Sequence, residues 1–148
     1  MKKALLSLIL LCTFMFTLTG CNTAKSYTFD VETGDKIKIE LNTTDGYDLS
    51  SSLPFTVSKD GSVLSQGTFI TLDGYDDYVD RVNNDTNSTI LDSGSMNGVT
   101  YTFYSYNDTE FNYIIKIDNS NTALLLGNPN SQNEAQTIFE LLTFSTEK

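Results

Sequence analysis

The side chains that could do chemistry in this chain are carboxylates, hydroxyls and phenols, because the sequence contains no histidine and only two cysteines. Without histidine, neither a serine–histidine catalytic pair nor a histidine-ligated zinc site can be built. A serine–lysine pair would have to use Lys59 or Lys116, and both lysines are expected to point outward from strands. The candidate sites are therefore carboxylate clusters and tyrosine surfaces.

Three aspartates, Asp73, Asp76 and Asp77, lie within five residues of one another. Carboxylate oxygens are ligands of Ca²⁺, and paired carboxylates can hydrolyse glycosides. The same residues are typical of a helix N-terminus, where they cap the helix and favour its dipole. An EF-hand over residues 83–94 is excluded, because Ser88 stands where that loop needs glycine and its last position is Gly94 rather than glutamate.

Four tyrosines are candidates for a ligand-binding surface. Tyr104 and Tyr106 alternate with inward-facing residues of a predicted strand, so they lie on its second face. Tyr75 and Tyr78 come from a predicted short helix that could lie near them. Exposed tyrosines can recognise protein or sugar, whereas buried ones complete the core, and both interpretations are open.

The segment Leu18-Thr19-Gly20-Cys21 ends an N-terminal leader in which Lys2 and Lys3 precede a mainly apolar stretch. This is the organisation of a secretory signal peptide, and the stretch is shorter than the roughly 20 apolar residues of a membrane-spanning helix. The segment resembles the lipobox of bacterial lipoproteins. That resemblance implies cleavage before Cys21, a covalent lipid on Cys21, and anchoring on the extracytoplasmic face of the inner or outer membrane. An ordinary signal peptide or an N-terminal membrane helix is the alternative.

The leader divides the chain into a signal peptide over residues 1–20, a tether over 21–26 and one domain over 27–148. Loss of Lys2 and Lys3 leaves seven basic residues against nineteen acidic ones, a formal charge of −12. Such a charge repels nucleic acid, and it suits either plain solubility or a cationic partner. Cys21 would be the only remaining cysteine, so no disulfide is expected.

Alternating and β-branched stretches predict a mainly antiparallel sheet. The predicted strands cover residues 27–31, 36–41, 53–59, 62–65, 67–72, 99–106, 111–117 and 122–126, with a brief strand at 88–91. Asp60-Gly61 between two of them is a hairpin signal, and Gly67 is a candidate bulge.

Two helices are predicted from apolar residues at positions i, i+3, i+4 and i+7. The first carries Tyr75, Tyr78, Val79 and Val82, with Asp73 as its expected cap. The second begins at a capping box, Ser131 with Glu134, and carries an apolar stripe that should pack on the sheet. The stripe consists of Ala135, Ile138, Phe139 and Leu142.

The expected fold is thus α+β: a mainly antiparallel sheet of about six to eight strands, one short helix, and a C-terminal helix packed on the sheet. The region 97–144 resembles the C-terminal half of PsbP-like domains, in which two aromatic-rich strands and an apolar strand precede a helix. The resemblance rests on residues 101–104, 113–115, 123–126 and 133–139. It implies a fold and carries no catalytic residue.

The sequence therefore predicts a membrane-anchored extracytoplasmic lipoprotein, most simply a non-enzymatic binding or accessory module for an envelope protein or polymer. It implies no cofactor other than the lipid on Cys21. The alternative is a carboxylate-based hydrolase or a calcium-dependent binding protein.

Overall fold

The computed structural model describes residues 23–129 and 131–147, so the leader, the lipobox-like segment and Cys21 lie outside the described residues. The order of strands and helices in the described chain is as follows. The elements are β1 (Ala24–Asp30), β2 (Lys36–Asn42), a 3-10 turn (Thr44–Gly46), β3 (Tyr47–Leu49), β4 (Phe55–Lys59), β5 (Ser62–Thr71), α2 (Leu72–Asn84), β6 (Ser88–Met96), β7 (Val99–Tyr106), β8 (Glu110–Ile117), β9 (Thr122–Asn128), α3 (Gln132–Leu141) and β10 (Leu142–Glu147).

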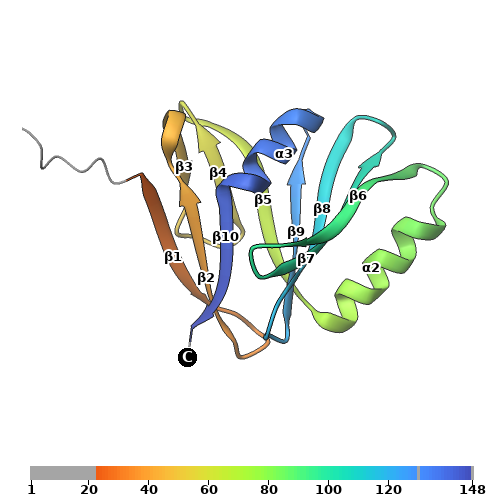
Figure 1. Ribbon diagram of the computed structural model, residues 1–148, viewed down its shortest axis with the longest axis horizontal. Coiled ribbons are helices and arrows are strands. Elements are labelled where there is room, and N and C mark those ends of the chain that lie inside the picture. The colour runs from red at the N-terminus through yellow and green to blue at the C-terminus, as the bar shows by residue number, and fades with distance from the viewer. Residues whose placement is uncertain (1–22, 130, 148) are drawn as a thin grey trace, which may run out of the picture.

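The strands of the described chain form two sheets rather than one. A three-stranded sheet has the order β1-β2-β10, and a seven-stranded sheet has the order β3-β4-β5-β9-β8-β7-β6. The pairings are antiparallel throughout. Figure 1 shows the small sheet and α3 on one side of the large sheet and α2 on the other.

The expectation of a single sheet with six to eight strands is therefore wrong, whereas the two predicted helices correspond to α2 and α3. The described residues contain ten strands, and the chain leaves α3 directly into β10, which pairs with β2. Leu142 falls at i+3 from Phe139 and so fits the predicted apolar stripe of the helix. With Phe144 it also alternates with polar neighbours, which is the pattern of a strand with one buried face.

Other boundaries also differ from those expected. β6 extends to Met96, where a loop was expected from residue 92, and β3 lies in a segment expected to be loop. β1 begins at Ala24, so residues 24–26 of the expected tether belong to the sheet. The hairpin at Asp60-Gly61 is confirmed, and both residues have the positive φ that a type I′ turn needs.

The main core lies between the two sheets and under α3. Phe29, Ile37 and Ile39 of the small sheet are buried, as expected from their alternation, and they face buried strands of the large sheet. Phe103, Tyr113 and Phe139 form an aromatic stack, with ring centroids 4.3 and 4.2 Å apart, that fixes α3 against β7 and β8. Ser131 Oγ caps α3 by accepting from the backbone N–H of Glu134, which confirms the predicted cap.

A second, smaller apolar layer lies on the other face of the large sheet, beneath α2. Val82 of α2 is buried there, and so are Ile114 of β8 and Ala123 of β9. The cap of α2 is not Asp73 as expected. Thr71 Oγ1 accepts from the backbone N–H of Gly74 at 3.1 Å, because the helix begins at Leu72, two residues earlier than a cap at Asp73 would place it.

Candidate functional site

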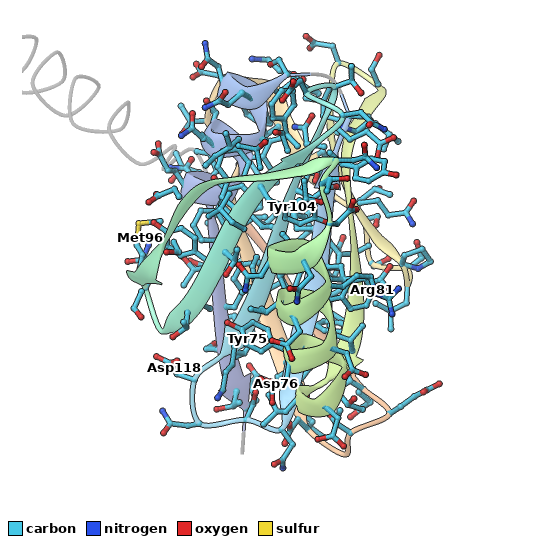
Figure 2. The ribbon with its side chains drawn as sticks, turned by 90° about the vertical axis from the view of Figure 1, so that its right-hand side faces the viewer. Tyr75, Asp76, Arg81, Met96, Tyr104 and Asp118 are labelled. Carbon is cyan, nitrogen blue, oxygen red and sulfur yellow. The ribbon has the colours of Figure 1, made fainter. Side chains whose placement is uncertain are left out.

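The structure brings the four candidate tyrosines to the side of the large sheet that carries α2. Tyr75 and Tyr78 belong to α2, and Tyr104 and Tyr106 belong to the face of β7 that α2 covers. All four side chains are half-buried. In Figure 2, Tyr75 lies beside the first turns of α2 and Tyr104 near its far end.

The surroundings of two phenol groups on this side of the large sheet, those of Tyr75 and Tyr104, raise their pKa values. Burial raises the pKa of Tyr104, and the neighbouring phenol of Tyr78 and the carboxylate of Glu110 add to the shift. Burial likewise raises the pKa of Tyr75, with a contribution from Asp76, while a hydrogen bond with Thr102 acts in the opposite direction. Arg81 lies over the Tyr78 ring, 5.4 Å from its centroid. These tyrosines therefore belong to the interface that holds α2, with only part of their surface turned outward.

The three candidate metal ligands lie on the first turns of α2. Asp73, Asp76 and Asp77 are exposed, and within residues 23–129 and 131–147 no group of three or more acidic, histidine or cysteine side chains is arranged to hold a metal ion. Asp73 instead lies in the first turn of the helix, where negative charge is favourable. The calcium and hydrolase alternatives stay predictions.

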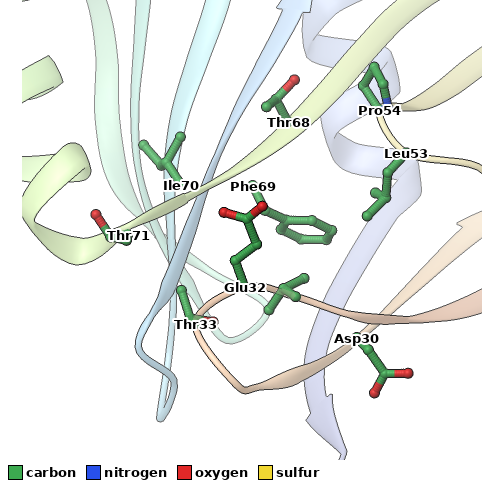
Figure 3. Close-up of a pocket in the computed structure, with 10 residues that line it drawn as sticks. Asp30, Glu32, Thr33, Leu53, Pro54, Thr68, Phe69, Ile70 and Thr71 are labelled. Atoms are coloured by element: carbon green, nitrogen blue, oxygen red, sulfur yellow. The ribbon is translucent and has the colours of Figure 1, made fainter.

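A cavity of about 460 Å³ lies on another part of the surface, at the end of β1 (Figure 3). It was not predicted from the sequence, because its walls come from three distant segments. They are the end of β1 with the turn after it, the loop before β4, and the last residues of β5. The lining consists of Asp30, Val31, Glu32, Thr33, Leu53, Pro54, Thr68, Phe69, Ile70 and Thr71.

The cavity exists because β4 is shorter than β5. Phe55, the first residue of β4, pairs with Gly67, and beyond that point residues 68–71 of β5 pair only with β9. The other edge of β5 is thus left without a strand partner among the described residues. A free strand edge presents backbone N–H and C=O groups, which can orient a ligand by hydrogen bonds.

Phe69 gives the cavity an apolar lining that is held by other rings. Its centroid is 5.9 Å from that of Phe29 and 6.1 Å from that of Phe55. Phe55 in turn packs over Gly67, where an added Cβ would lie 2.0 Å from the Phe55 ring. Gly67 is therefore a site of close aromatic approach rather than the expected bulge, since the irregularity in this hairpin falls between Val57 and Ser58.

The charged groups of the cavity are both acidic. Asp30 is 3.8 Å from the ammonium of Lys36, and both side chains are well exposed. Glu32 forms no ion pair within the part of the chain that the structure describes. Figure 3 shows the Glu32 side chain reaching over the cavity beside Phe69, whereas Asp30 points away. Leu53 contributes an apolar side chain that is 50% exposed.

Hydroxyl groups line the remaining wall, and one of them belongs to a polar cluster that joins the two sheets. Thr33 contacts Thr122 through their hydroxyls, and Asp35 accepts from the Thr122 hydroxyl at 2.8 Å. The turn that carries Glu32 and Thr33 is therefore fixed to the start of β9. A fixed wall lets the cavity bind a ligand without first ordering its own loop.

Comparison with known proteins adds no relative. No family model matches the chain, and neither a curated protein nor a solved structure is significantly similar to it. The likenesses to bacterial lipoproteins and to PsbP-like domains stay predictions. None of the helices in the described part of the chain is long and apolar enough to cross a membrane.

Proposed function

We propose that this chain is a lipid-anchored binding or accessory module on the extracytoplasmic face of the cell membrane. The observation that carries the proposal is the segment Leu18-Thr19-Gly20-Cys21 behind a signal-peptide-like leader. Acyl chains on Cys21 would supply an anchor, since each buried methylene contributes about 0.8 kcal/mol. The sheet begins at Ala24, so an acylated Cys21 would hold the domain close to the membrane.

A binding role is supported by the cavity next to β5. Its volume of about 460 Å³ falls in the range of small-molecule sites, and it combines an apolar lining with a few polar groups. The acidic surface favours a ligand or envelope partner with positive charge. A module of this kind holds its ligand or partner near the membrane and needs no catalytic step.

Labelling cells with palmitate tests the anchor directly. The wild-type protein should incorporate label, and Cys21→Ala should lose it and leave the membrane fraction. Cys12→Ala is the matched control, because Cys12 lies inside the leader and should not affect labelling. Label retained by Cys21→Ala, or a mature N-terminus other than residue 21 by mass spectrometry, would overturn the proposal.

A further inference from the structure

We propose that the cavity between β1, the loop before β4 and β5 binds a small organic cation, an ammonium group carried on an apolar body. This names the ligand class of the proposed binding module and rests on that function. The binding itself depends on the folded domain and not on the lipid. Three features of the described residues carry the inference: the apolar lining, the single unpaired carboxylate at the mouth, and the open edge of β5.

The apolar part of the ligand is defined by Phe69 and its neighbours. Phe69 and Val31 line the cavity from the inside, while Leu53 and Pro54 line it from the loop. An apolar group entering here would cover Leu53, which is half exposed and therefore contributes favourable burial on binding. The face of Phe69 could also attract a cation, because an aromatic ring carries negative potential on its face.

The charge of the ligand is defined by Glu32. Its side chain reaches over the cavity, and no basic residue lines the cavity to compete with an incoming cation. Asp30 contributes less, since it points away and lies near Lys36. An anion entering the same cavity would meet the Glu32 carboxylate and no basic residue in the lining, so the cavity should discriminate against anions.

The hydrogen-bonding part is supplied by the edge of β5 and by the hydroxyls beside it. An ammonium has three N–H donors, and carbonyl and hydroxyl oxygens accept from it. The unpaired edge over residues 68–71 and the hydroxyls of Thr33 and Thr71 provide such acceptors around the lining. A cation can thus satisfy its donors while its apolar body stays on Phe69.

The position of the cavity favours a ligand from the aqueous phase. It lies at the Asp30 end of β1, whereas the lipid would be attached before the Ala24 end. A strand of this length spans about 20 Å. The cavity is therefore separated from the proposed anchor by the length of β1, which makes a dissolved cation a better candidate than a bilayer lipid.

The test uses three probes of similar shape and different charge: phenethylammonium, phenethyl alcohol and phenylacetate. The full-length lipidated protein in nanodiscs of zwitterionic lipid would be titrated by ligand-observed NMR, with empty nanodiscs as background. We expect saturable binding of phenethylammonium, weaker binding of the alcohol and none of phenylacetate. No saturable binding of the ammonium, or equal affinity for all three probes, would overturn the proposal.

Two variants locate the binding. Glu32→Gln should weaken phenethylammonium binding by about fivefold, the upper range for one exposed ion pair, and leave the alcohol unchanged. Leu53→Ser should weaken both. Glu140→Gln on the exposed face of α3 is the matched control and should change neither. Glu32→Asp keeps the charge and should keep the preference for the cation. A preference for the cation that survives Glu32→Gln intact would contradict the assignment.

The outcomes of the two proposals are distinguishable. Loss of the palmitate label in Cys21→Ala tests only the anchor, because the label reports acylation and not ligand binding. Probe affinities measured on the Glu32 and Leu53 variants test only the ligand class proposed for the cavity. A labelled protein without ammonium binding therefore retains the proposed anchor and loses the ligand class.

Discussion

The carboxylate of Asp35 accepts a hydrogen bond of 2.7 Å from the backbone N–H of Asn121, which lies 86 residues later in the chain. The same oxygen accepts from the hydroxyl of Thr122 at 2.8 Å. Asp35 belongs to the turn between β1 and β2, and Asn121 to the turn between β8 and β9. One side chain thus joins the small sheet to the large one, next to the cavity wall at Thr33.

Replacing Asp35 should loosen this junction. Hydrogen bonds to a charged group contribute about 1.5–3 kcal/mol each. Asp35→Ala should therefore lower the free energy of unfolding by at least the contribution of one such bond. Asp35→Asn keeps an acceptor without the charge and should cost less. Urea unfolding measures both. Asp118→Ala is the control, because Asp118 is exposed and the structure gives it only a backbone bond. Equal stability of Asp35→Ala and Asp118→Ala would contradict the role of the carboxylate.

Gly67→Ala should displace the Phe55 ring, which packs over Gly67 and contacts Phe69 of the cavity. The new Cβ would lie 2.0 Å from Phe55 Cζ, so the buried Phe55 ring would have to move, and such overpacking costs typically about 1–3 kcal/mol. Phe69, which contacts Phe55, should shift with it. Thermal unfolding and NMR shifts of the cavity residues measure the effect.

Gly74→Ala is the matched glycine control for that experiment. Gly74 lies in the first turn of α2, where an added Cβ meets nothing closer than 3.4 Å. Because alanine is favoured over glycine in helices by about 1 kcal/mol, this variant should be neutral or stabilising. Similar losses of stability in both variants would show that Gly67 is not specifically required by Phe55.

The N-terminus of α2 can be assigned by comparing two substitutions. Thr71→Ala removes the oxygen that accepts from the Gly74 N–H, and loss of such a cap costs about 1 kcal/mol. Asp73→Ala removes only a favourable charge near the helix dipole, worth a few tenths of a kcal/mol up to about 1. Urea unfolding in high salt distinguishes the two stability losses, because salt screens the charge interaction of Asp73 and leaves the Thr71 hydrogen bond intact. If Asp73→Ala lost more unfolding free energy in high salt than Thr71→Ala, Asp73 rather than Thr71 would be the cap.

Tyr113 should make the fold sensitive to alkaline pH. Burial raises the pKa of Tyr113 well above its usual range, and the phenol of Tyr101 and nearby carboxylates add to the shift. The unfolded chain therefore releases this proton first, at a pKa near 10. The stabilising contribution is complete below about pH 10 and declines as pH rises further, by up to about 1.36 kcal/mol per pH unit.

Tyr113→Phe tests this dependence while keeping the stacked ring between Phe103 and Phe139. Above pH 10 the free energy of unfolding of the variant should fall less steeply with pH than that of the wild type. The difference between the two slopes should correspond to about one proton released on unfolding. Urea unfolding at a series of alkaline pH values measures the slope, with the difference between the two proteins at pH 7 as the reference. Parallel declines would mean that Tyr113 does not titrate differently in the two states.

Short-range features were predictable because neighbouring residues decide them. The Asp60-Gly61 hairpin follows from the positive φ that both residues adopt, and the α3 cap follows from a serine three residues before a glutamate. Burial of Phe29, Ile37 and Ile39 follows from alternation along single strands. The placement of Tyr104 and Tyr106 on the α2 side of β7 follows from the same period of two.

Long-range features were not predictable, because alternation marks a buried face without saying which strands meet. It could not show that β10 joins β2 to form a second sheet, or that Leu142 leaves a helix. Nor could it place Glu32, Leu53 and Phe69 around one cavity, since they come from separate turns and strands. The signal that could have drawn attention to the cavity was Pro54 at the start of the strand predicted over residues 53–59, because a proline there favours a late strand start that leaves Leu53 outside the sheet.

By itself, the sequence determined the chemistry that is available: no histidine, an acidic surface, and a leader ending in Leu18-Thr19-Gly20-Cys21. Composition and local order are properties of the chain alone, so folding cannot change them. Only the tertiary structure decided that the candidate tyrosines hold α2 and that the open edge of β5 meets Glu32. The reason is that β4 begins only at Phe55, whose ring packs over Gly67, and packing between the sheets decides where one strand starts relative to its neighbour.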